Sequence, residues 1–92
     1  MYNIRVEVLN NEERTYTVYV SDKDDKQFTY KVAVSAKTMD QYDLELDDLP
    51  VVIENAFYFL LERESPSSIL SSFELMTIAT YFPSFSPGID MT

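Results

Sequence analysis

The first third of the chain alternates apolar and polar residues with a period of two. This alternation is typical of strands that bury one side and expose the other. The connections at 10–13 and 21–27 are polar and rich in Asn and Asp, as turns usually are. The pattern therefore predicts an antiparallel meander with strands at about 2–9, 14–21 and 27–35.

Residues 35–48 have a less decisive pattern. Tyr42, Leu44 and Leu46 alternate with acidic residues. This alternation fits either a short strand at 42–46 or an extended linker with three buried anchors. We favour the strand, so the expected sheet has three or four strands.

A long helix is expected at about 49–64. Asp48 can accept hydrogen bonds from the unpaired amides of the first turn, and Pro50 suits that turn because it lacks an N–H. Apolar residues then recur every three or four positions, as on the buried side of a helix: Val52, Ile53, Ala56, Phe57, Leu60 and Leu61.

A second helix is expected at about 66–82, after the start signal Ser65-Pro66 and before Pro83. Two serines at 71–72 and a change of phase near Glu74 leave open that this segment forms two short helices. The tail at 84–92 is expected to be irregular and attached through Phe85.

Together these elements predict a single two-layer α+β domain over 1–92, with one face of the sheet covered by the helical hairpin. A chain of 92 residues has room for one core. Apolar residues make up 46% of it, too many for a disordered acidic segment.

The distribution of charge excludes some classes of partner. The net charge is −9, and residues 38–92 carry all of it, with ten acidic side chains and only Arg63 as a basic one. Such a chain repels phosphate backbones and anionic lipid, so no direct nucleic-acid or membrane contact is expected. The N-terminal sequence shows no signal-peptide pattern, which makes the cytoplasm the expected location.

Residue types argue against an enzyme. The chain has no histidine and no cysteine, so it lacks the usual neutral-pH base and the commonest nucleophile and metal ligands. Asp43, Glu45, Asp47 and Glu54 have the spacing of a calcium loop, but Asp48 stands where that loop requires glycine. We expect no catalytic residue, no cofactor and no metal site.

The helical region resembles the C-terminal part of small, uncharacterised prokaryotic proteins. The resemblance covers 56–83 and rests on the run AFYFLLERE at 56–64, then on SIL at 68–70, Phe73, Ile78 and YFP at 81–83. It implies a helical-hairpin core and no activity.

The function expected first is a small acidic protein-interaction or regulatory module without catalytic activity. The first helix has more large apolar side chains than one stripe can bury, and Val51, Tyr58 and Phe59 form the expected interaction patch. The partner is another protein or a second copy of the chain, since a self-complementary apolar patch can form a homodimer.

The alternative is an acidic decoy, such as an antitoxin or DNA mimic, that occupies the basic nucleic-acid-binding surface of a partner. Its expected acidic face consists of Asp43, Glu45, Asp47, Asp48 and Glu54. Binding of this kind would be strongly salt-dependent.

Overall fold

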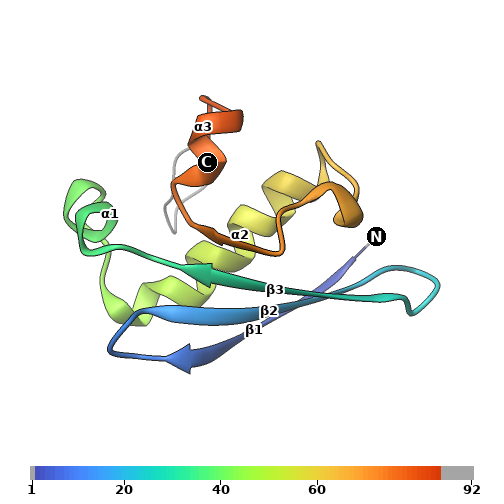
Figure 1. Ribbon diagram of the computed structural model, residues 1–92, viewed down its shortest axis with the longest axis horizontal. Coiled ribbons are helices and arrows are strands. Elements are labelled where there is room, and N and C mark those ends of the chain that lie inside the picture. The colour runs from blue at the N-terminus through green and yellow to red at the C-terminus, as the bar shows by residue number, and fades with distance from the viewer. Residues whose placement is uncertain (1, 86–92) are drawn as a thin grey trace.

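The computed structural model describes residues 2–85, which form an α+β fold with α2 across one face of a four-stranded sheet (Figure 1). The strands are β1 (Asn3–Asn10), β2 (Thr15–Ser21), β3 (Gln27–Ala33) and β4 (Ser72–Glu74). The helices are α1 (Ala36–Gln41), α2 (Leu49–Leu61) and α3 (Thr77–Tyr81), with 3₁₀ turns η1 (Leu46–Asp48) and η2 (Pro66–Ser68). The α+β class expected from the sequence is confirmed.

The first three strands form the expected antiparallel meander. The register pairs Val6 with Val18 and Val18 with Tyr30, so one apolar row crosses all three strands. The register of β1 against β2 shifts between Val8 and Asn10. The observed strand bounds lie within two residues of those expected.

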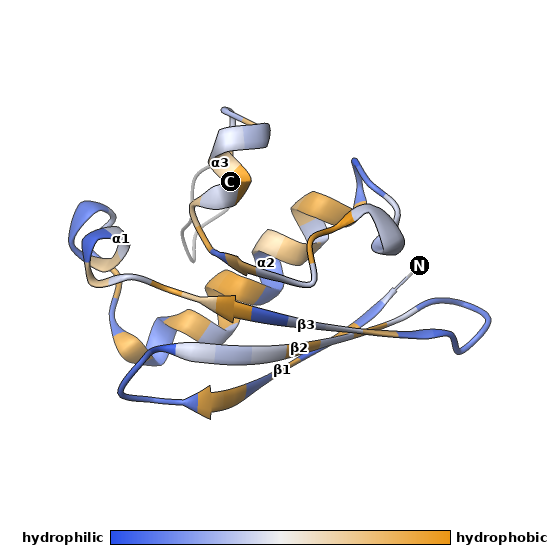
Figure 2. Cartoon of the chain, viewed as in Figure 1, coloured by the Kyte–Doolittle hydropathy of each residue, from blue (hydrophilic) through white to orange (hydrophobic). Residues whose placement is uncertain are grey.

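The core lies between the sheet and α2. Its sheet side consists of alternate residues of β2 and β3, and its helix side is the expected apolar stripe (Figure 2). The buried members from these elements are Tyr16, Val18, Val20, Tyr30, Val32, Leu49, Val52, Ile53, Ala56, Phe57 and Leu60.

The prediction of a strand at 42–46 is wrong. Residues 36–41 form α1, whose first turn is capped by the Ser35 hydroxyl accepting from the Thr38 N–H. Asp43 then adopts a positive φ of 53°, which ends the helix. Leu46 is exposed, so the alternation in this segment does not mark one buried side.

The fourth strand is β4, which runs parallel to β3. It lies within the segment expected to be a single helix at 66–82, so the predicted helical hairpin is wrong in its second half. That segment instead contains η2, β4 and α3. Without β4, the outer edge of β3 would leave backbone N–H and C=O groups unpaired, and a strand can bond to them whereas a helix cannot. Phe73 of β4 also packs on Phe57, with the ring centroids 6.0 Å apart.

The start of α2 has the expected residues in a different arrangement. Pro50 lies in the first turn and Asp48 is the N-cap residue, yet the Asp48 side chain makes no capping bond to α2. It accepts instead from the Glu45 N–H at 3.2 Å. The cause is η1, which leads directly into α2 and places Asp48 inside a turn rather than before one.

The expected attachment of the tail through Phe85 is confirmed. This side chain is buried, with its ring 5.2 Å from that of Phe59. The rest of the tail expected to be irregular, at 86–92, lies outside the described residues. Within 2–85 the helices are all too short to cross a membrane.

Candidate functional site

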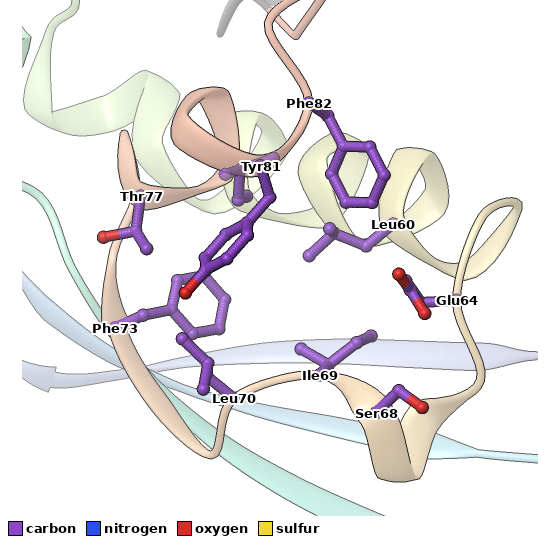
Figure 3. A pocket seen from close by; sticks show the side chains of 10 residues that line it. Leu60, Glu64, Ser68, Ile69, Leu70, Phe73, Thr77, Tyr81 and Phe82 are labelled. Carbon is purple, nitrogen blue, oxygen red and sulfur yellow. The ribbon is translucent and has the colours of Figure 1, made fainter.

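An apolar pocket lies between the end of α2, the segment that follows it, and α3 (Figure 3). Its volume is about 250 Å³. Ten residues line it: Leu60, Glu64, Ser68, Ile69, Leu70, Phe73, Thr77, Ile78, Tyr81 and Phe82.

Hydrogen bonds to the sheet hold one wall of the pocket in place. The Tyr30 hydroxyl donates to the Pro66 carbonyl at 2.6 Å, and this bond ties the turn after α2 to β3. Lys31 N–H donates to Ser71 carbonyl oxygen at 2.8 Å, just before β4 begins. Residues 69–70 therefore run between two fixed points and form one wall of the pocket.

The opposite wall is α3. This short helix follows β4 through a turn in which the Ile78 N–H donates to the Leu75 carbonyl. Phe82 packs edge-on against Phe59, with ring centroids 5.9 Å apart. The contact holds the end of α3 above α2 and keeps the pocket open between them.

Two large side chains at the rim face solvent. Leu70 is 49% exposed and Tyr81 is 65% exposed. Glu64 is the one charged residue among the described lining residues, and Figure 3 shows its carboxylate beside the opening. The pocket thus offers an apolar hollow with a single negative charge at its edge.

The pocket lining offers few polar groups. The polar lining groups are one carboxylate, three hydroxyls and no nitrogen base. The Ser68 hydroxyl lies 3.0 Å from the Ser65 hydroxyl, so it has no base to activate it there. The volume is also below the roughly 300–1,000 Å³ typical of sites for cofactors and drug-sized ligands.

The structure leaves two of the three residues of the expected interaction patch exposed and partly buries the third. Val51 and Tyr58 are each 47% exposed and lie two helical turns apart on α2. Phe59 is half-buried: it packs on Phe82 and Phe85, and the Arg63 guanidinium lies 3.7 Å from its ring centroid. Only Val51 and Tyr58 therefore remain as exposed apolar residues on this helix.

The residues of the expected acidic face lie at the other end of α2. Asp43, Glu45 and Asp47 are exposed around η1, while Asp48 and Glu54 are half-buried. No group of three or more potential metal-ligating side chains occurs in the described part of the chain.

Eight of the ten lining residues lie in the segment expected to be a second helix at 66–82, and a helix there predicts no pocket. The signal that could have pointed to an exposed site was the pair of serines at 71–72, which interrupts the apolar spacing after Leu70. Neither protein-family models, nor curated proteins, nor solved structures yield a match to the chain. The resemblance over 56–83 stays a prediction.

Proposed function

We propose that this chain is a non-catalytic protein-interaction module that receives an apolar side chain of a partner in the pocket between α2 and α3. The observation that carries the proposal is the apolar hollow rimmed by exposed Leu70 and Tyr81. Interface cores are enriched in aromatic side chains and depleted of charge, and this pocket has that composition. The cytoplasm, where proteins fold without disulfides, is the proposed location.

The charge distribution selects the class of partner. Glu64 lies beside the opening, and residues 38–92 carry the whole net charge of −9. A basic residue of the partner, next to the docked apolar side chain, would be attracted by this negative charge. The attraction would speed the association of the two proteins and orient the partner at the pocket. The proposed occupant is therefore a protein segment with a leucine- or phenylalanine-sized side chain beside a lysine or arginine.

A direct test uses short blocked peptides as probes and amide and methyl chemical shifts of the full chain as the readout. A Leu-Lys peptide is expected to shift the signals of Leu60, Phe73 and Ile78, whereas Gly-Lys leaves them unchanged and Leu-Glu shifts them less. Leu70→Asp should abolish the response. Val51→Asp, at a similarly exposed position on α2, is the matched control and should keep it.

Recovery of partners from lysate at low and high salt separates this proposal from the acidic decoy. A partner that is retained at high salt and lost only in Leu70→Asp supports docking in the pocket. A basic partner that binds Leu70→Asp normally and dissociates at high salt favours the decoy, because charge-driven association is screened. Absence of any pocket response to the apolar peptides at millimolar concentration would contradict the proposal.

A further inference from the structure

β1 is an edge strand with an open outer side. The sheet order β1-β2-β3-β4 places it at one end of the sheet, with no strand of the described chain beyond it. The end of β1 is apolar (Figure 2). Val8 and Leu9 there are 52% and 55% exposed. A free edge of eight residues presents unpaired backbone groups to any second strand.

The hydrogen bonds between β3 and β4 establish which backbone groups are free on β1. Lys31 donates to the Ser71 carbonyl, and the Ala33 carbonyl accepts from Leu75, both at 2.8 Å. The odd-numbered residues of β3 therefore point their backbone groups toward β4. Since these groups alternate along a strand, the even-numbered residues of β3 point toward β2.

The pairing registers of the strands extend this alternation across the sheet. Tyr30 of β3 pairs with Val18 of β2, so the even-numbered residues of β2 point toward β3 and its odd-numbered residues toward β1. Tyr19 pairs with Arg5, so the odd-numbered residues of β1 are bonded to β2. The backbone groups left facing the open edge belong to Ile4, Val6 and Val8.

We propose that two copies of this chain associate through β1, antiparallel, about a twofold axis at Val6, and so form one continuous eight-stranded sheet. In this register Val6 meets Val6 of the second copy, and Ile4 meets Val8. All of these residues have free backbone groups, so each pair exchanges both hydrogen bonds. The exposed side chain of Val8 gains an apolar neighbour on the same face of the sheet.

The charges of Arg5 and Glu7 favour this register over the two adjacent in-phase registers. About Val6, Arg5 lies opposite Glu7 of the second copy, twice by symmetry, at non-hydrogen-bonded positions where opposed side chains are closest. Moving the axis to Arg5 or to Glu7 keeps the backbone groups in phase but opposes two arginines or two glutamates. The Arg5 and Glu7 side chains are 67% and 49% exposed and lie 3.2 Å apart within the strand. The Arg5 guanidinium also lies 4.7 Å from the ring centroid of Tyr19, and the dimer would add Glu7 of the second copy as a further partner.

This inference does not depend on the pocket, which lies on other elements. Its test is a set of charge reversals followed by sedimentation equilibrium and native mass spectrometry. The wild-type chain should dimerise with increasing concentration. Arg5→Glu and Glu7→Arg should each weaken the homodimer by about tenfold or more, because each turns two attractive cross-strand pairs into repulsive ones.

Mixing the two single variants should restore association, since Arg5→Glu and Glu7→Arg complement each other in this register. The double variant Arg5→Glu/Glu7→Arg should dimerise like the wild type. Tyr58→Asp on α2 is the control for a dimer built on the helix and should leave the dissociation constant unchanged. Circular dichroism of each variant verifies that the monomer is folded.

Three outcomes would overturn the inference. The wild-type chain could stay monomeric from micromolar to millimolar concentration. The single variants could dimerise as tightly as the wild type. Finally, the mixture of the two single variants could remain monomeric although both are folded, which would show that no Arg5–Glu7 pairing across the axis exists.

Discussion

The hydroxyl of Tyr30 donates a hydrogen bond of 2.6 Å to the carbonyl of Pro66, thirty-six residues further along the chain. Tyr30 is buried in β3, and its ring lies 5.0 Å from the ring of Phe57 on α2. One side chain thus joins the sheet, the main helix and the turn that carries the pocket wall. Stability and pocket geometry should respond together when this bond is removed.

Tyr30→Phe should lower the free energy of unfolding by about 1–2 kcal/mol, because a buried carbonyl loses its partner while the ring stays in place. Urea unfolding measures the change. The same variant should shift the amide signals of residues 66–70. Tyr19→Phe, on the half-exposed side of β2, is the matched control and should change stability by less than about 0.5 kcal/mol. An equal loss in both variants would contradict this account.

Alkaline pH should destabilise the fold through the same residue. Burial, with a smaller contribution from Tyr2, raises the pKa of Tyr30 to about 12. Burial, and then the charge of Asp47, also raises the pKa of Tyr16 above its usual value of 10.0. The unfolded chain releases these protons first, so the stabilisation is complete below pH 10 and is lost as the pH rises toward 12.

Urea unfolding at a series of pH values, with tyrosinate absorbance as the titration signal, measures this loss. Tyr30→Phe should show a smaller fall in stability above pH 10 than the wild type, because one shifted group is gone. An identical fall in the variant would assign the alkaline loss to other groups, with Tyr16 the first to examine.

Thr15→Val should raise the free energy of unfolding by about 1 kcal/mol. The Thr15 hydroxyl is buried and lacks a hydrogen-bond partner within residues 2–85. Replacing it with a methyl group of similar shape removes a desolvated polar atom and leaves the packing intact. Thr17→Val, at a half-buried position on the same side of β2, should be close to neutral. Thermal unfolding of the pair checks this, and a destabilised Thr15→Val would show that the hydroxyl has a partner.

Glu74→Ala should destabilise the fold by about 2 kcal/mol and release α1. One carboxylate oxygen of Glu74 accepts from the Ser35 N–H and the Thr38 hydroxyl, both at 3.0 Å, and the other accepts from the Met76 N–H at 2.9 Å. Hydrogen bonds to a charged acceptor are among the stronger ones in proteins. Amide exchange in α1 should accelerate, whereas the exposed control Glu62→Ala should leave it unchanged.

Millimolar Ca²⁺ or Mg²⁺ should leave the melting temperature within about a degree. A ligand at 100 times its dissociation constant would add about 2.7 kcal/mol and several degrees to a domain of this size. Asp43 and Glu45 precede η1 and Asp47 lies within it, and within residues 2–85 no group of three or more acidic side chains is placed to hold a metal. A rise of about five degrees that disappears in Asp43→Asn/Asp47→Asn would make this segment a metal site.

The sequence by itself determined the elements whose pattern is local. The three strands of the meander follow from alternation along each strand, and α2 follows from apolar residues spaced three and four apart. Pro83, just beyond the end of α3, and the buried anchor Phe85 could also be read from the chain. These features depend on neighbours within a few residues, which a linear pattern records.

Only the tertiary structure decided how residues 66–82 fold. Their apolar spacing fits a helix, but Phe73 lies in a strand because β3 has backbone groups that need partners and Phe57 provides a surface to pack on. The same non-local pairing separates Leu70 from α3 and opens the pocket between them. Helical periodicity cannot reveal this outcome, because the competing hydrogen bonds belong to residues some forty positions earlier in the chain.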